Sequence, residues 1–310
     1  MTHSDFVSGA VRIVVPASSA NVGPGFDAMG LALTIHDELT AMVTDDSGVR
    51  VEVEGEGAGD VPTDEQHLVA QAMQLGFTTM GKTPNGFILK CRNAIPHGRG
   101  LGSSAAAIIG GLAVARELVA DGADLLPDHE LLNVALSMEG HPDNLSASLY
   151  GGFTVSWLDS ERAAGSVCID IHPSVVPIIA IPPHALATSK ARGVLTDQVS
   201  RANATHNVAR AGLLVHAMST DPSFLLPATE DALHQNERAH IYPETTELIA
   251  RVRSLGIAAV ASGAGPAVLM LINKSKPEQL EGLSALIPSD WTSVAVPVDR
   301  EGVRRVEIPA

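Results

Sequence analysis

Hydrophobic residues in the first half of the chain either alternate with polar residues or form short continuous runs. Such runs favour β-strands, and we expect strands at residues 11–15, 39–44, 49–53, 87–91 and 153–158. Between some of them, apolar positions recur at helical spacing, which predicts helices at residues 65–80, 104–120 and 129–139. The first half therefore mixes both kinds of element.

A polar stretch of small residues, DSERAAGS at residues 159–166, interrupts this pattern. After it we expect strands at residues 167–171, 176–181, 257–261, 268–272 and 293–296, and helices at 205–218, 243–254 and near 276–286. We place a domain boundary near residue 165, which divides the chain into domains at residues 1–165 and 166–310. This arrangement favours an α+β fold class.

The composition of the chain limits the range of functions that the protein can have. The 310 residues are 45% hydrophobic, enough for a well-buried core and more naturally two domains than one. Lys and Arg number 20 against 35 Asp and Glu, so the net charge of -15 disfavours nonspecific binding to nucleic acid or to an anionic membrane. Any anion that the protein binds must therefore meet a local site.

The hydrophobic runs, the first ten residues and the two cysteines indicate the cellular compartment. No apolar run approaches the ~18 residues that span a bilayer, and the opening MTHSDFVSGA lacks a basic segment followed by an apolar one, so we expect a cytoplasmic protein. Cys91 and Cys168 each lie in an apolar alternating stretch without the paired spacing of a metal site. We expect both to be buried free thiols.

Residues 96–106, PHGRGLGSSAA, place three glycines at alternate positions before two serines and an alanine-rich stretch. Glycine lets the backbone adopt positive φ and approach a ligand closely, so successive amides can converge on an anion. Ser103 and Ser104 then lie where a helix would begin, and a helix N-terminus offers unpaired N–H donors. Phosphate suits such a loop, although a glycine turn with a serine cap is an alternative.

Other phosphate-binding loops do not fit. A Walker A loop needs a lysine after its last glycine, and a dinucleotide fingerprint needs an acidic residue about 20 positions on, at the end of a second parallel strand. Asp121 and Asp124 instead lie in the loop after the predicted helix. A second glycine run, GEGAGD at residues 55–60, carries acids that would repel phosphate, so we interpret it as a turn.

The 96–106 loop resembles the phosphate loop of the GHMP kinases, the superfamily of galactokinase, homoserine kinase, mevalonate kinase and phosphomevalonate kinase. Two further motifs of that superfamily occur in the right order, PASSANVGPGFD at residues 16–27 before the loop and SGAGPA at residues 262–267 after it. The first motif resembles the homoserine kinase family in particular, as do EGHPDN at residues 139–144, TSKAR at 188–192 and DALHQNER at 231–238. The motifs together span most of the chain.

This resemblance implies a two-domain GHMP kinase fold, with an N-terminal α/β domain that holds a left-handed βαβ-type unit and the phosphate loop, and a C-terminal ferredoxin-like α+β domain. It implies phosphorylation of the side-chain hydroxyl of L-homoserine by ATP, on the route to threonine, and a homodimer. ATP would lie between helix and loop at the domain interface. The residues assigned to it are Pro96, His97, Gly98, Arg99, Gly100, Leu101, Gly102, Ser103, Ser104, Ala105 and Ala106.

A kinase of this type uses Mg²⁺, which prefers oxygen ligands. By resemblance, Ser104 and Glu139 supply them. Glu139 could instead be a solvated acid at a helix end, and Ser104 a mere helix cap.

The substrate carries an ammonium, a carboxylate and the accepting hydroxyl, so it calls for acids, arginines and a neutral polar group. By resemblance, the ammonium and hydroxyl face Asn21, Asp27, His141 and Asp143. Arg192 and Arg238 face the carboxylate. Asn21, Asp143 and Glu139 are the candidate catalytic residues, and a general base is unnecessary if the phosphate takes the proton.

Each substrate residue also has a plain structural interpretation. Asn21 and Asp27 could stabilise the Gly-Pro-Gly turn between them. His141 could be an ordinary loop histidine, and the two arginines could form surface ion pairs. Residues 263–267 could be a hairpin turn between two strands.

Two other functions remain open. A mevalonate- or sugar-type GHMP kinase would also use the loop, but a sugar lacks a carboxylate for the arginines and mevalonate lacks an ammonium for the acids. A catalytically silent GHMP-fold binding protein would need a damaged loop or metal site. Neither residues 98–104 nor Glu139 show such damage.

Overall fold

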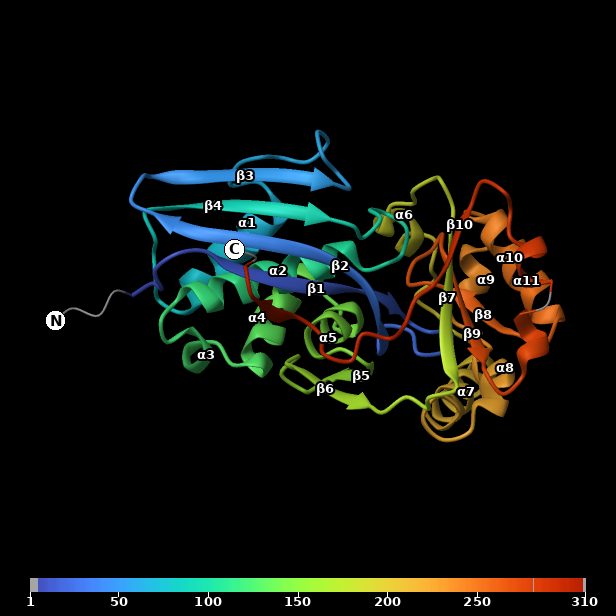
Figure 1. Cartoon of the computed structure of the whole chain (residues 1–310). Helices are drawn as coiled ribbons and strands as arrows, with labels where there is room; N and C mark the ends of the chain where they lie inside the picture. Colours follow the sequence, from blue (N-terminus) through green and yellow to red (C-terminus); the bar gives the residue numbers. More distant parts are fainter. Residues whose placement is uncertain (1–4, 281, 309–310) are drawn as a thin grey trace.

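Two β-sheets lie side by side, and helices pack on both (Figure 1). The computed structural model describes residues 5–280 and 282–308. Within them the first sheet has seven strands and the second has four. The chain is a two-domain α+β protein, as the sequence predicts.

The first sheet has the strand order β11-β1-β2-β4-β3, with β5 paired to β2 and β6 paired to β5. Its strands are β1 Val11–Ala20, β2 Met29–Thr44, β3 Gly48–Gly55, β4 Gly86–Asn93, β5 Phe153–Leu158, β6 Ala164–Ile169 and β11 Arg304–Val306. β3 and β4 run parallel, and helix α1 (Leu68–Thr79) connects them. They form the expected βαβ unit, while the other pairings are antiparallel.

Helix α2 (Ser103–Leu118) forms the centre of the first domain. It packs against α1 and β1, and most of its Ala, Ile, Leu and Val side chains are buried. Gly111 allows the close approach to α1, because a Cβ there would lie 2.6 Å from the Val69 carbonyl oxygen. Around it lie α3 Gly122–Leu125, α4 Asp128–Glu139 and α5 Asp143–Tyr150.

The second sheet has the order β10-β7-β9-β8, and every pairing is antiparallel. Its strands are β7 Val175–Ile181, β8 Ala258–Ala261, β9 Val268–Asn273 and β10 Thr292–Ala295. Helices lie between β7 and β8 and between β9 and β10, which gives the βαββαβ order of a ferredoxin-like domain. These helices are α6 Thr188–Arg192, α7 Arg201–Ser219, η1 Pro222–Phe224, α8 Leu225–Ala228, α9 Gln235–Arg238, α10 Pro243–Ser254, η2 Pro277–Leu280 and α11 Leu283–Leu286.

Alternation along β7 and β9 buries both faces of the second sheet. Ile179 and Leu269 join the main core, which continues into α7 and the first domain. Ile178 and Met270 point the other way and pack with Leu248 of α10. Because the main core spans the junction, the two domains share apolar packing.

Several predicted elements need correction. β1 and β2 are longer than expected, because residues 15–20 of β1 and 29–33 of β2 are buried throughout and show no alternation of burial. The helix predicted near 276–286 is replaced by the short η2 and α11. Helices α5, α6 and α9 were not predicted, while the run at residues 55–60 is a turn as expected.

The prediction of two buried thiols was half wrong. Cys91 is buried, whereas Cys168 is exposed. Cys168 lies on β6, whose only partner among the described strands is β5, so one edge of its strand has no neighbour in the sheet. Both cysteines are free.

The boundary at residue 165 remains a prediction, and the strand pairings favour a different division. β6 pairs with β5, so residues 164–169 belong to the first sheet. The C-terminal segment also returns to that sheet, where Val298 pairs with Leu33 and β11 pairs with β1. We therefore propose that the second domain spans the residues from β7 to β10.

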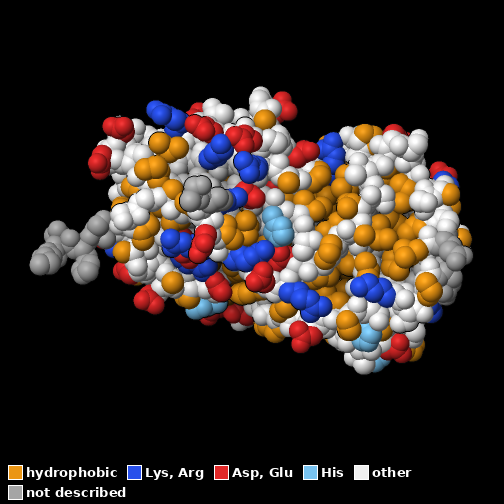
Figure 2. All heavy atoms as spheres, viewed as in Figure 1, with side chains coloured by type: hydrophobic (Ala, Val, Ile, Leu, Met, Phe, Trp, Pro, Cys, Tyr) orange, Lys and Arg blue, Asp and Glu red, His pale blue; other side chains and the backbone are white. Residues whose placement is uncertain are grey.

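The surface viewed in Figure 2 carries Lys, Arg, Asp and Glu side chains intermixed over the first domain, and fewer charged side chains over the second. Among the described residues, no helix has both the length and the apolar character needed to cross a bilayer.

Candidate active site

The three motifs at residues 16–27, 96–106 and 262–267 meet at the junction of the two sheets. The Ser18 amide donates to the Leu101 carbonyl over 3.0 Å. Ser262 Oγ donates to the Gly100 carbonyl over 2.6 Å, and Asn21 Nδ2 donates to the Gly263 carbonyl over 2.9 Å. Hydrogen bonds thus join motifs that lie more than 80 residues apart in the sequence.

The glycine loop leads directly into α2. Gly98, Gly100 and Gly102 have φ of 66°, 74° and 69°, a region that other residues rarely adopt. A Cβ on Gly100 would lie 2.1 Å from the Ser262 carbonyl oxygen, and one on Gly102 would lie 2.1 Å from Ser18 Oγ. Gly100 and Gly102 are therefore required for packing between the motifs as well as for their backbone conformation. Helix α2 begins at Ser103, which confirms the predicted start of the helix.

A polar cleft lies over this junction and contains most of the predicted site residues. Its walls are Ala20, Asn21, Gly98, Gly100, Leu101, Gly102, Ser103, Ser104, Ala105, Glu139, His141, Asp143, Asn144, Thr188, Arg192, Arg238, Gly263 and Ala264. The residues come from both domains. Asn144, Thr188 and Ala20 were not predicted to belong to the site.

Ser104 and Glu139 place two oxygen groups together in the cleft. Ser104 Oγ, in the first turn of α2, donates to Glu139 Oε2 over 2.9 Å. Glu139 ends α4, and Gly140 then turns the chain with φ of 92°. Both side chains offer oxygen atoms, which are the ligands that a hard divalent cation prefers.

Two carboxylates and a histidine also gather at the cleft, which His141 and Asp143 line directly. One ligand atom from each of Asp27, His141 and Asp143 lies within 4.8 Å of the others. His141 Nδ1 is 3.4 Å from Asp143 Oδ1. Burial alone would lower the pKa of His141, but Asp143 raises it above the ordinary value.

Arg192 forms a two-bond pair with Asp27. Its Nη2 donates to Asp27 Oδ1 over 2.6 Å, and its Nη1 donates to Oδ2 over 3.1 Å. Burial opposes the charge of Arg192, but Asp27 raises its pKa. The residues assigned to opposite ends of the substrate, Asp27 and Arg192, thus neutralise each other in this structure.

Arg238 is only 1% exposed, so it is not a surface ion-pair residue. Its Nε donates to the Ala191 carbonyl over 2.9 Å, and its Nη1 lies 3.0 Å from His234 Nδ1. The guanidinium carbons of Arg238 and Arg192 lie 5.7 Å and 5.8 Å from the centre of the Phe26 ring. Both arginines therefore contact one aromatic ring, a favourable arrangement for each cation.

Some of the predicted residues do not line the cleft. Asp27 contacts it through Arg192. Pro96 and Arg99 line neither the cleft nor the cavity beside it, and Arg99 donates instead to the carbonyls of Pro182 and Pro183. Its side chain ties the loop to the second domain. His97 and Ala106 line the neighbouring cavity.

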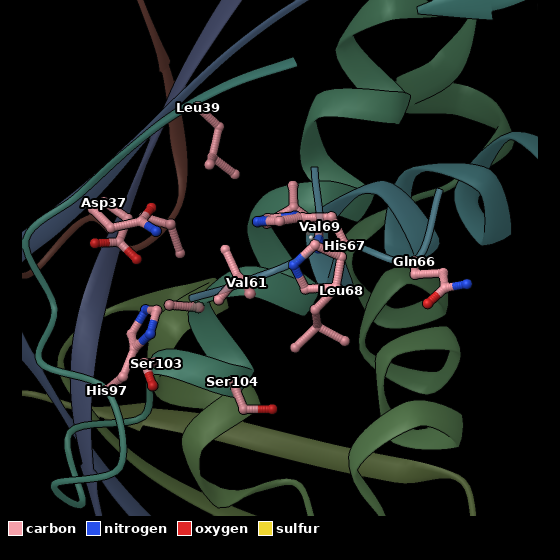
Figure 3. A pocket seen from close by; sticks show the side chains of 15 residues that line it. Asp37, Leu39, Val61, Gln66, His67, Leu68, Val69, His97, Ser103 and Ser104 are labelled. Atoms are coloured by element: carbon pink, nitrogen blue, oxygen red, sulfur yellow. Dashed lines mark hydrogen bonds between the residues drawn. The ribbon is translucent and has the colours of Figure 1, made fainter. Parts of the chain in front are cut away.

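That neighbouring cavity has a volume of about 350 Å³, within the roughly 300–1,000 Å³ range of small-ligand sites, and Ser103 and Ser104 line it as well as the cleft. Figure 3 shows His67 and Leu68 facing Asp37 and His97 across it. Its other walls are Val15, Leu39, Val61, Pro62, Gln66, Val69, Asn93, Ala106 and Ala107. Ser103 and Ser104, at the start of α2, thus form a wall shared by the two spaces.

This cavity could not be predicted from the sequence, because an apolar cavity wall shows the same residue pattern as an apolar core. Two of its polar residues support the backbone. His67 Nδ1 accepts from the Val69 amide at the start of α1. Asp37 accepts from the amides of Ala94 and Ile95, and burial raises the pKa of its carboxyl.

Comparisons with known proteins agree with this geometry. Residues 67–152 match the family model "GHMP kinases N terminal domain", and residues 213–282 match "GHMP kinases C terminal". The chain is 44% identical to the homoserine kinase of Streptomyces coelicolor over 302 residues, which cover 97% of this chain and 96% of that protein. It is 43% identical to the homoserine kinase of Streptomyces avermitilis over the full length of both.

Solved structures share the fold. The crystal structure of homoserine kinase from Cytophaga hutchinsonii superposes with a TM-score of 0.83 at 23% identity, and covers 99% of this chain and 100% of that one. Mevalonate diphosphate decarboxylase from Staphylococcus aureus gives a TM-score of 0.68 at 16% identity, with 96% and 98% coverage. At these identities the likeness establishes the fold alone.

Proposed function

The chain belongs to the homoserine kinase family of the GHMP kinases, and we propose that the cleft between its two sheets is where that chemistry takes place. The activity is transfer of a phosphoryl group from ATP to the side-chain hydroxyl of L-homoserine, which yields O-phospho-L-homoserine for threonine biosynthesis. The observation that carries the assignment to this cleft is the meeting of all three motifs beside the buried Arg238.

ATP would occupy the cavity and the adjoining loop. The apolar cavity suits a nucleotide base, while the loop and the N-terminus of α2 suit its phosphates. Ser103 and Ser104 line both spaces. This order would direct the terminal phosphate toward the polar cleft.

Ser104 and Glu139 would hold Mg²⁺, because their oxygens are already together and lie beside the phosphate loop. When bound, Mg²⁺ would neutralise charge on the phosphates. Glu139 would act in catalysis only through this role.

The substrate would bind in the cleft between Asp143 and Arg238, which both line it. Asp143, with His141 and Asp27, would face the ammonium, and Arg238 would face the carboxylate. Arg192 would have to divide its donors between Asp27 and the substrate, since Asp27 already occupies both of its terminal nitrogens. Asn21, held by Gly263, would orient the accepting hydroxyl.

Phosphoryl transfer requires in-line placement of the alcohol and stabilisation of developing charge more than a strong base. Asp143 is buried and fixed at the start of α5, so it can orient the hydroxyl or accept its proton. Arg238 and Arg192 would hold the other end of the same molecule. Catalysis would therefore depend on the fixed distance between Asp143 and the two arginines.

We also propose that the enzyme acts in the cytoplasm. That it is a homodimer remains a prediction.

The test is ADP release in the presence of Mg²⁺, with homoserine, serine, mevalonate and galactose offered in parallel. Homoserine should support turnover at a far higher kcat/KM than mevalonate or galactose, because the cleft offers partners to an ammonium and to a carboxylate. Equal turnover of mevalonate or galactose would contradict the substrate assignment.

A further inference from the structure

His234 is completely buried and lines neither the cleft nor the adjoining cavity. Its Nδ1 lies 3.0 Å from Nη1 of Arg238, and its Nε2 lies 2.9 Å from the Gly23 carbonyl oxygen. Its ring stacks on Phe26 with 5.2 Å between the ring centres and 26° between the planes. One imidazole thus contacts an arginine of the second domain and the Gly-Pro-Gly turn of the first motif.

The hydrogen-bond partners of the His234 ring determine which of its two nitrogens carries a hydrogen. A guanidinium only donates hydrogen bonds, so Nδ1 must accept from Arg238. A carbonyl only accepts, so Nε2 must carry the hydrogen that is donated to Gly23. A single neutral tautomer satisfies both contacts, whereas a protonated ring would lose the bond to Arg238.

The surrounding charges agree with a neutral ring. Burial is the main cause that lowers the pKa of His234, and the positive charge of Arg238 lowers it further. Asp231 and Asp27 act in the opposite direction, and Asp231 Oδ2 lies 3.6 Å from Nε2. Asp231 is already occupied, because it accepts from the amides of Leu233, His234 and Gln235 at the start of α9.

We propose that His234 is a positioning residue that orients Arg238 toward the substrate and ties it to the turn that carries Asn21 and Asp27. The inference rests on the proposed function, because Arg238 is assigned there to the homoserine carboxylate. His234 itself does not reach the substrate. Its loss should therefore change the KM for homoserine more than it changes kcat or the KM for ATP.

Two substitutions separate the contacts of the ring. In His234→Asn the amide oxygen lies as many bonds from Cα as Nδ1 does, so it can still accept from Arg238. In His234→Gln the amide nitrogen lies as many bonds from Cα as Nε2 does, so it can still donate to Gly23. His234→Phe keeps the stacking on Phe26 and loses both hydrogen bonds.

We expect His234→Gln and His234→Phe to raise the KM for homoserine by about 10- to 100-fold, because a buried charged donor loses its acceptor. His234→Asn should stay within about 3-fold of the wild type, since it keeps that acceptor. In an Arg238→Leu background, all three changes should have almost no further effect on kcat/KM, because coupled residues are not additive.

Equal KM values in the Asn and Gln variants, a fall in kcat without a rise in KM, or full additivity with Arg238→Leu would each overturn the inference. His234→Gln and His234→Phe both lack the acceptor for Arg238. If one of them does not fold, the other still tests the inference. If the wild-type protein did not phosphorylate homoserine at all, the proposed function would fail instead.

Discussion

The cavity beside the loop and the polar cleft differ in how they are built. The cavity takes every wall residue from the first domain, between Val15 and Ala107, and most of its walls are apolar. The cleft takes residues from Ala20 to Ala264, from both domains, and many carry charge or hydrogen-bond to a distant motif. Apolar contact is non-directional, whereas charged groups must meet at defined angles and distances.

The difference suggests that substitutions in the two regions will have effects of different size. A change in the cavity removes a little contact area, and neighbouring side chains can partly compensate. A change in the cleft leaves a charge without its partner in a partly buried site, where such a loss is costly. The nucleotide end should therefore tolerate substitution better than the substrate end.

The largest effect is expected from Arg238→Leu, which leaves the substrate carboxylate without its buried partner. Truncating one member of such a pair costs roughly 2 to 5 kcal/mol, so kcat/KM for homoserine should fall by about 30-fold to several thousand-fold. ATP affinity without homoserine should stay within about threefold, and Arg238→Lys should recover only part of the loss. Equilibrium ATP binding and steady-state kinetics measure the two quantities.

Arg305→Leu is a matched control, because Arg305 is 54% exposed and pairs with Glu117 away from the cleft. It should leave both quantities unchanged. If Arg238→Leu weakened ATP binding and left the homoserine KM alone, Arg238 would belong to the nucleotide site, and the contrast between the two regions would disappear.

Glu139→Gln comes next, because it keeps the shape of the side chain and removes the charge proposed to hold Mg²⁺. We expect kcat to fall by a factor on the order of 100, with more Mg²⁺ needed for half-maximal rate. Thermal unfolding should hardly change. Titration of the rate against Mg²⁺ checks the prediction.

Glu130→Gln, in the first turn of the same helix, is the control for this change. It should behave like the wild type. Loss of activity in Glu130→Gln but not in Glu139→Gln would move the metal ligand to Glu130.

Val61→Ala should have a smaller effect, confined to the cavity. Removing two methyl groups from an apolar wall costs on the order of 1 to 1.5 kcal/mol, so the KM for ATP should rise roughly 5- to 10-fold. The KM for homoserine should not change. Val208→Ala, on the exposed face of α7, is the control and should alter neither constant. If Val61→Ala lowered kcat/KM as much as Arg238→Leu does, the contrast between the cavity and the cleft would be wrong.

The smallest effect on activity is expected from Asp299→Asn, outside both regions. Burial alone would raise the pKa of Asp299, but hydrogen bonds from His36 and from the amides of Gly302 and Glu301 lower it to about 2. Because the folded-state pKa lies below the usual value of 3.8, this carboxylate stabilises the fold above about pH 4 and loses that effect as the pH falls toward 2.

At pH 7, Asp299→Asn should lower the free energy of unfolding by roughly 1 to 2 kcal/mol and leave kcat and both KM values unchanged. Urea unfolding at pH 7 and at pH 3 measures the difference, which should be smaller at pH 3. A difference that stayed constant over this range would show that the ionised carboxylate is not the source of the stability.

Local sequence was sufficient for many elements and for the start of the site. The apolar spacing in residues 104–120 predicts a helix, and α2 begins at Ser103, directly after the glycine loop. The same information was insufficient for β2, whose first residues are buried on both sides, and for α9, which has only four residues. Alternation and helical periodicity are defined only where one face is solvated and the element spans several turns.

The sequence by itself determined the family, through three motifs, and the identity of most residues in the cleft. Only the tertiary structure decided that Arg192 pairs with Asp27, that Arg99 bonds to the second domain, that Cys168 is exposed and that His234 supports Arg238. The physical reason is that a motif specifies residue types and backbone conformation over a few positions. Charge pairing, burial and the tautomer of a ring depend on which distant segments pack beside them.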